Sequence, residues 1–148
     1  MSDWSPRTFE DKLLAAYHDA VGGRMYTEVA IAWSRGYMDW PAGHSHRSID
    51  AVRLVEPYFE EDIIPFANHG PEVLNSVEEA DVELIEVKQD LNRNVIGQVV
   101  AGRDLFSADY EPASIKGIAL CANTDSALEW VCEQENIIVE IYEPVELE

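Results

Sequence analysis

The chain has 148 residues, of which 47% are hydrophobic and 26% are charged, so it contains enough apolar material for one hydrophobic core. No apolar run approaches the roughly 20 residues that a membrane helix needs, and the start, MSDWSPRTFE, lacks the pattern of a signal peptide. We therefore expect one domain over residues 1–148 in a cytoplasmic protein with no membrane partner. Two lone cysteines, Cys121 and Cys132, predict reduced core positions rather than a disulfide framework.

The net charge is −19, from 29 acidic and 10 basic side chains. Such a charge ordinarily argues against a nucleic-acid partner, because Lys and Arg contacts to phosphate supply most of that binding. The acidic residues are segregated from the basic ones, however, because no Lys or Arg occurs from Leu54 to Val87. The composition resembles that of halophilic proteins from a salt-saturated cytoplasm, where about 1 M salt shortens the Debye length to roughly 3 Å. Net charge therefore does not exclude DNA as a partner.

The N-terminal half predicts a helix followed by a β-hairpin. Ser5 followed by Pro6 indicates a helix N-cap, and apolar residues then recur at helical spacing up to Gly22 and Gly23. From Met25 to Trp33 the residues alternate, which predicts a strand with Met25, Thr27, Val29, Ile31 and Trp33 on one face. A second strand is expected from about Arg47 to Val55, paired with the first.

The rest of the chain predicts further strands and helices in alternation. Residues 56–80, with Pro57 and Pro65, indicate an insertion that ends in a short helix. Strands are expected over 81–88, 115–122 and 136–142. Helices are expected over 91–106 and, N-capped by Thr124, up to about residue 134. This order predicts an α/β (α+β) fold, a mixed sheet flanked by helices.

Two charged side chains project from the strand DVELIEVK. Glu86 and Lys88 share a face with Val82 and Leu84, while Ile85 and Val87 occupy the other face. Burying such charges without partners is costly, which favours a functional site. The alternative is an exposed strand end where the two side chains form a surface ion pair that contributes at most about 1 kcal/mol.

Three further polar residues fall at positions that face the core in this interpretation. Gln98 lies within the apolar stripe of the 91–106 helix, where an unsatisfied amide costs on the order of 1–3 kcal/mol. Asp50 shares a strand face with Val52 and Leu54, and Glu28 lies on the small-residue face of the first strand. Pairing of these strands would gather three carboxylates, Lys88 and Gln98 into one cluster.

Three carboxylates cannot all ionise side by side unless a cation joins them, and oxygen ligands suit Mg²⁺ or Mn²⁺. Such an ion polarises a phosphoryl oxygen and lowers the pKa of a bound water. Lys88 would position that water or offset developing negative charge. The cluster therefore predicts phosphodiester hydrolysis.

An Asp on one strand, Glu-x-Lys on the next and a Gln on the following helix resemble the PD-(D/E)XK nuclease superfamily, including archaeal Holliday-junction resolvases and RecB-like nucleases. The match spans about residues 28–106. The resemblance implies a restriction-endonuclease-like fold, Asp50 and Glu86 as metal ligands, Lys88 and Gln98 as catalytic residues and Glu28 as the upstream acid. Glu10, on the first helix, is the alternative upstream acid. Ile49 and Gly102 differ from the family pattern, which often has Pro before the Asp and, in RecB-like members, Tyr four residues after the Gln.

The resulting hypothesis is a Mg²⁺-dependent DNA endonuclease or structure-specific nuclease of repair, recombination or viral replication. Arg93 and Asn94 at a helix start, with Arg35 and Arg47, are the candidate nucleic-acid-binding residues. Resemblance and small size imply a homodimer. The alternative is a catalytically inactive nuclease fold that serves as a DNA-binding or protein-interaction module.

Overall fold

A six-stranded mixed sheet forms the centre of the computed structural model, which describes residues 4–31, 47–55, 62–66 and 76–144. Its strands are β1 (Arg24–Ile31), β2 (Arg47–Leu54), β3 (Ile63–Pro65), β4 (Asp81–Asp90), β5 (Ser114–Asn123) and β6 (Ile137–Ile141). Their spatial order is β3-β1-β2-β4-β5-β6. β2 runs antiparallel to both β1 and β4, which confirms the predicted hairpin, and the other neighbouring pairs are parallel.

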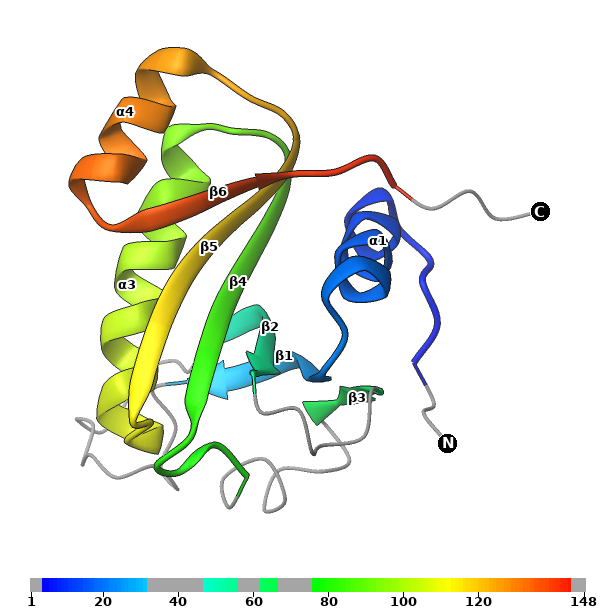
Figure 1. Ribbon diagram of the computed structural model, residues 1–148, viewed down its shortest axis with the longest axis vertical. Helices are drawn as coiled ribbons and strands as arrows, with labels where there is room; N and C mark the ends of the chain where they lie inside the picture. Colours follow the sequence, from blue (N-terminus) through cyan, green and yellow to red (C-terminus); the bar gives the residue numbers. More distant parts are fainter. Residues whose placement is uncertain (1–3, 32–46, 56–61, 67–75, 145–148) are drawn as a thin grey trace.

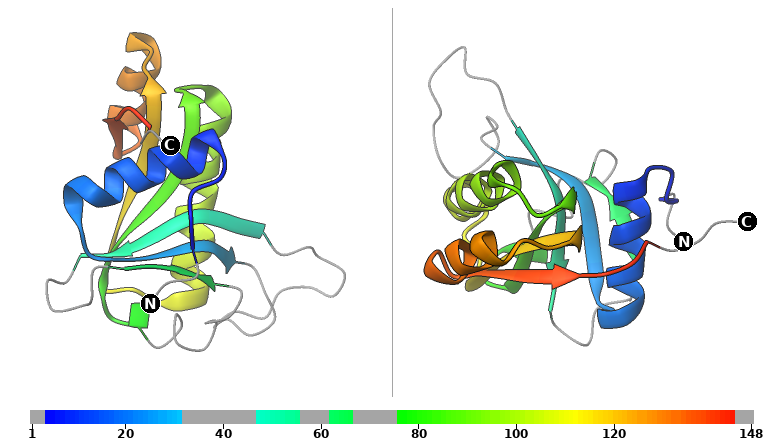
Figure 2. Two further views of the ribbon diagram at one scale, coloured as in Figure 1. Left: turned by 90° about the vertical axis from the view of Figure 1, so that its right-hand side faces the viewer. Right: turned by 90° about the horizontal axis from the view of Figure 1, so that it is seen from above.

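Helices cover both faces of this sheet. α1 (Phe9–Val21) crosses one face, while α3 (Arg93–Tyr110) and α4 (Ser126–Gln134) lie on the other (Figures 1 and 2). The predicted mixed α/β sheet flanked by helices is therefore confirmed. Within the described residues, none of the helices combines the length and the apolar character required to cross a bilayer.

The core is divided by the sheet. On the α1 side, Leu13, Leu14 and Tyr17 pack on strand residues that include Met25 and Ile85. On the α3 side, Phe106 and Tyr110 stack at 4.6 Å and pack on residues that include Val52, Leu54, Val82 and Leu84. A third cluster, between α3, α4 and β5, contains Cys121 and Cys132, which are free and buried as predicted.

Both predicted N-caps differ from those observed. α1 is capped by Thr8 rather than Ser5: the Thr8 hydroxyl accepts from the Asp11 N–H at 3.0 Å, and the Asp11 carboxylate accepts from the Thr8 N–H at 3.3 Å. This reciprocal capping box satisfies two backbone donors at once, which a Ser–Pro start does not. α4 is capped by Asp125 rather than Thr124, because the Asp125 carboxylate accepts from Leu128 N–H at 3.1 Å.

Substituting Thr8 by Ala is expected to lower the free energy of unfolding by about 1 kcal/mol, since it removes the acceptor for one helix N–H group. Urea unfolding at fixed salt measures this loss. The matched control is Ser5→Ala, which should leave the stability unchanged. A loss at Ser5 that equals the loss at Thr8 would contradict the observed helix start.

The predicted insertion contributes to the sheet. Residues 63–65 form β3, which pairs in parallel with β1 through Met25 and Ile63, instead of looping out entirely. A parallel edge strand requires only a few backbone hydrogen bonds, so a three-residue segment with one Pro can form it. Residues 71–75 of the predicted short helix over 71–80 lie outside the described residues, as does the end of the first predicted strand at Trp33.

Candidate functional site

The alternation of β1 breaks at Glu28. The ladder pairs Thr27 with Ala51 and Val29 with Ile49, but Glu28 between them has φ of 51°, in the left-handed region. Met25 consequently packs on the α1 side, whereas Val29 and Ile31 pack on the α3 side. The prediction that all three share one face is therefore wrong, because a left-handed residue reverses the in–out order of the strand beyond it.

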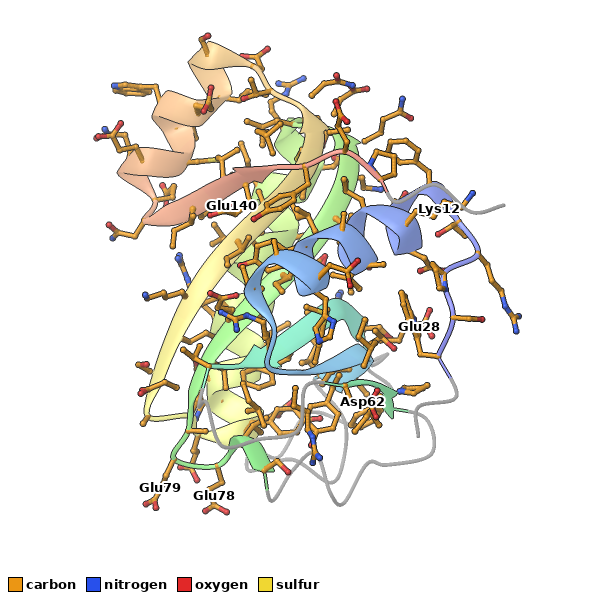
Figure 3. The ribbon with its side chains drawn as sticks, turned by 45° about the vertical axis from the view of Figure 1, so that its right-hand side comes forward. Lys12, Glu28, Asp62, Glu78, Glu79 and Glu140 are labelled. Carbon is orange, nitrogen blue, oxygen red and sulfur yellow. The ribbon has the colours of Figure 1, made fainter. Side chains whose placement is uncertain are left out.

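The same irregularity reorients Asp50 on the facing strand. Its predicted neighbours Val52 and Leu54 belong to the α3-side core, but Asp50 lines a cavity on the α1 side. Asp50 therefore does not share the face predicted from its spacing. Glu28 lines the same cavity, and Figure 3 shows it in the space between the strand ends and the N-terminal segment.

This cavity, the α1 cavity, has a volume of about 450 Å³. Both candidates for the upstream acid, Glu10 from α1 and Glu28 from β1, line it beside Asp50. Its complete lining is Trp4, Ser5, Arg7, Thr8, Glu10, Asp11, Leu14, Thr27, Glu28, Asp50, Pro65 and Val87. The N-terminal segment, α1 and four strands thus converge on one acidic hollow.

Asp50 and Glu86 are joined across β2 and β4. Glu86 Oε1 accepts from the Asp50 N–H at 3.0 Å, and Asp50 Oδ2 accepts from the Val87 N–H at 2.8 Å. These bonds lie immediately beyond the Ala51–Ile85 pair, where the regular β2–β4 ladder ends. Each carboxylate thus takes the place of a backbone carbonyl and holds the two strands together at their point of divergence.

Glu86 lines a second hollow, the α3 cavity, on the opposite face of the sheet. This cavity also has a volume of about 450 Å³, and Arg47, Arg93, Asn94 and Gln98 line it with Glu86. Four of the predicted site residues are therefore brought to one place with Glu86. Arg35, the other predicted nucleic-acid-binding residue, lies outside the described residues.

Gln98 is exposed and does not belong to the buried stripe of α3, which corrects the sequence prediction. The buried stripe runs through Val95, Val99, Gly102 and Phe106. Gln98 lies one position before Val99, at the edge of this stripe. The amide therefore meets solvent at the α3 cavity, and no buried partner is required.

Burial is the main influence on both central carboxylates. It raises the pKa of Glu86 to about 8, and the nearby Asp50 charge adds to this rise. Burial also raises the pKa of Asp50, with contributions from the charges of Glu10 and Glu28. Hydrogen bonds from backbone N–H groups and the positive charge of Lys88 oppose both shifts. Glu86 is 4% exposed, so the predicted burial of this acid is confirmed.

The raised pKa of Glu86 makes stability depend on pH. The folded protein binds a proton at Glu86 up to about pH 8, whereas the unfolded chain loses it near pH 4.5. The contribution of Glu86 to stability should therefore be fully present below pH 4.5 and be lost as the pH rises to about 8, a change of a few kcal/mol. Denaturant unfolding across this range, without divalent cations, measures the fall.

Glu86→Gln is the matched variant, because its amide oxygen can still accept the Asp50 N–H bond. It should remove most of the pH-dependent fall and be more stable than the wild type above pH 8. Equal slopes in the two proteins between pH 4.5 and 8 would contradict the assignment of this titration to Glu86.

A buried polar cluster on the α1 side was missed by the sequence prediction. The Glu83 carboxylate accepts two bonds from the Arg53 guanidinium, at 2.8 and 3.0 Å, and one from the Tyr17 hydroxyl at 2.8 Å. Arg53 also donates to the Gly22 carbonyl at the end of α1. The two-residue period of the strand could have revealed this cluster, because it places Glu83 on the same face as the apolar residues Ile85 and Val87.

In the described part of the chain, no three His, Cys, Asp or Glu side chains are gathered into a group that could hold a metal ion. Comparisons with protein-family models, with curated proteins and with solved structures find no match. The fold defines an α/β protein with a helix-flanked mixed sheet. The candidate site is therefore interpreted from its own geometry and charge.

Proposed function

We propose that this protein is a metal-dependent DNA endonuclease or structure-specific nuclease that hydrolyses phosphodiester bonds. The observation that carries the proposal is a pair of hydrogen bonds where β2 and β4 diverge: Glu86 accepts from the Asp50 N–H, and the Asp50 carboxylate accepts from the Val87 N–H. The acids of the α1 cavity and the arginines of the α3 cavity flank this point. The proposed family is the PD-(D/E)XK superfamily, whose motif combines an Asp with Glu-x-Lys. The proposal includes a role in repair, recombination or viral replication.

Asp50 and Glu86 are the two carboxylates that would hold a Mg²⁺ or Mn²⁺ ion, where their side chains approach each other between the two cavities. Such ions favour oxygen ligands, and Mg²⁺ is commonly held by one or two carboxylates, with water and phosphate oxygens in its remaining positions. Glu86 is buried and Asp50 is partly buried, and their pKa values are raised because the ionised forms lack sufficient compensation. A divalent cation would supply that compensation, with Glu28 or Glu10 as a third acid.

The protein residues have distinct proposed roles. A bound divalent ion would lower the pKa of water and polarise a phosphoryl oxygen. Lys88, whose charge acts on both Asp50 and Glu86, would orient the attacking water or offset negative charge on the phosphate. Arg47, Arg93, Asn94 and Gln98, which line the α3 cavity, would hold neighbouring phosphates.

Cleavage of plasmid, branched and single-stranded DNA tests the proposal, with Mg²⁺ or Mn²⁺ and with EDTA, from low salt to several molar KCl. We expect cleavage that requires the divalent ion and that persists at high salt, where the repulsion from the −19 charge is screened. Absence of cleavage for every DNA and every salt concentration, in a folded protein, would reject the enzymatic proposal.

A catalytically inactive module that binds DNA or protein is the second candidate function. The observation in its favour is that Asp50 and Glu86 already satisfy backbone N–H groups, which is a structural role in itself. Calorimetry with Mn²⁺ separates the two candidates. The nuclease requires a Mn²⁺ site that weakens in Asp50→Asn, whereas a module would retain its DNA affinity without any such site. A homodimer in the cytoplasm remains part of the leading proposal.

A further inference from the structure

The α1 cavity combines an aromatic ring with the candidate catalytic acids. Trp4 and Pro65 supply apolar surfaces, and Ser5, Thr8 and Thr27 supply hydroxyl groups, in the same hollow that Asp50 lines. We propose that this cavity holds one unpaired nucleotide beside the phosphate that is cut, so that the substrates are single strands or unpaired segments of branched DNA. This inference rests on the proposed nuclease function and names its substrate class.

The size of the cavity is compatible with one nucleotide. A volume of about 450 Å³ lies within the range of roughly 300–1,000 Å³ typical of sites that enclose a single small molecule. A base that is paired and stacked in a duplex cannot enter such a hollow, since it has to leave the stack first. A nucleotide in a single strand carries no pairing cost, so unpaired DNA reaches the cavity with the smaller energetic penalty.

Charge assigns different parts of the DNA to the two cavities. Four acids, Glu10, Asp11, Glu28 and Asp50, line the α1 cavity, where Arg7 is the one basic residue in the lining. A neutral base and its sugar tolerate this lining, whereas a phosphate is repelled unless a bound divalent ion neutralises its charge. The α3 cavity, on the other face of the sheet, presents Arg47 and Arg93 and suits the phosphates.

Trp4 supplies the contact that recognises a base of any sequence. It is half-buried against the α1-side core, which restricts the ring, and it also lines the cavity. Stacking on an aromatic ring tolerates every base because each has a π-face, and loss of one such contact weakens binding about tenfold or more. We therefore expect a preference for unpaired DNA without a strong preference for sequence.

The binding test uses a 2-aminopurine oligonucleotide in Mg²⁺ with protein that carries Lys88→Met, which the proposed function makes inactive. The single strand should change its fluorescence on binding, and the matched duplex should not. Trp4→Ala should weaken single-strand binding about tenfold, while Trp4→Phe, which keeps a ring, should retain it. The control is Trp130→Ala, because Trp130 lies on α4 and is 62% exposed. Thermal unfolding verifies that each variant is folded.

Cleavage assays with Lys88 restored complete the experiment. Single-stranded and branched DNA should be cut at least tenfold faster than duplex, and Trp4→Ala should reduce that ratio. Equal cleavage of duplex and single strands, or equal single-strand binding by Trp4→Ala and Trp130→Ala, would overturn the inference and leave the nuclease proposal intact. If no DNA is cut, the nuclease proposal fails, and the fluorescence result alone decides whether the cavity takes an unpaired base.

Discussion

Asp50→Asn is expected to lower Mg²⁺-dependent DNA cleavage by at least about 100-fold. A bound divalent ion contributes several kcal/mol to the transition state of phosphoryl transfer, and each 1.4 kcal/mol corresponds to about a factor of ten in rate. In the wild type, the Val87 N–H donates to Asp50 Oδ2 at 2.8 Å. The Asn side chain keeps an oxygen acceptor for this bond, so the strand contact survives while the charge is lost. Initial rates at saturating Mg²⁺ measure the effect.

Glu86→Gln should give a comparable loss for the same reason, because Glu86 is the second proposed metal ligand. The control is Glu129→Gln, an exposed acid on α4 that lines neither the α1 cavity nor the α3 cavity. Its cleavage rate should equal that of the wild type. Full activity in Asp50→Asn, with the fold intact, would exclude Asp50 from the reaction.

Breaking the buried pair of Arg53 and Glu83 is expected to cost about 3 kcal/mol of stability. The two side chains are 10% and 11% exposed and are 2.8 Å apart, so removing one leaves a charge that water reaches poorly. Arg53→Met and Glu83→Leu, measured by denaturant unfolding, should each show this loss. Because the pair is buried, the loss of stability should be nearly the same in several molar KCl. The contribution of a surface ion pair, in contrast, would be screened by that salt.

The double variant provides the control for this pair. With both charges replaced by apolar groups, much of the loss should be recovered, so that the two single effects are not additive. Some loss should remain, because the Tyr17 hydroxyl then has no Glu83 carboxylate to donate to. Additive losses would show that Arg53 and Glu83 do not stabilise the protein as a pair.

The order of elements was largely readable from local patterns. Alternation over 81–88 predicted β4 and placed Val82, Leu84 and Glu86 on one face and Ile85 and Val87 on the other, as observed. Local patterns were less able to locate helix starts, because Ser5 and Thr8 are both good capping residues. The choice between them depended on Asp11, which completes the capping box with Thr8.

The candidate site was predicted in part. The burial of Glu86 and the proximity of Asp50 to Glu86 followed from the strand pairing. The division of the site into two cavities did not, because it depends on one backbone angle, φ of 51° at Glu28, which strict alternation cannot anticipate. The exposure of Gln98 was mispredicted because the edge of an apolar stripe is uncertain by one residue until the helix is packed.

The sequence by itself determined the fold class, the two acids of the central strands and the segregation of charge, because these depend on residue type and on periods of two and 3.6. Only the tertiary structure decided which face each acid meets, that Glu10 and Glu28 border the same cavity, and that Glu83 has Arg53 and Tyr17 as partners. The physical reason is that these contacts join residues far apart in the chain. Their geometry is fixed by strand register and helix packing, which local propensity does not encode.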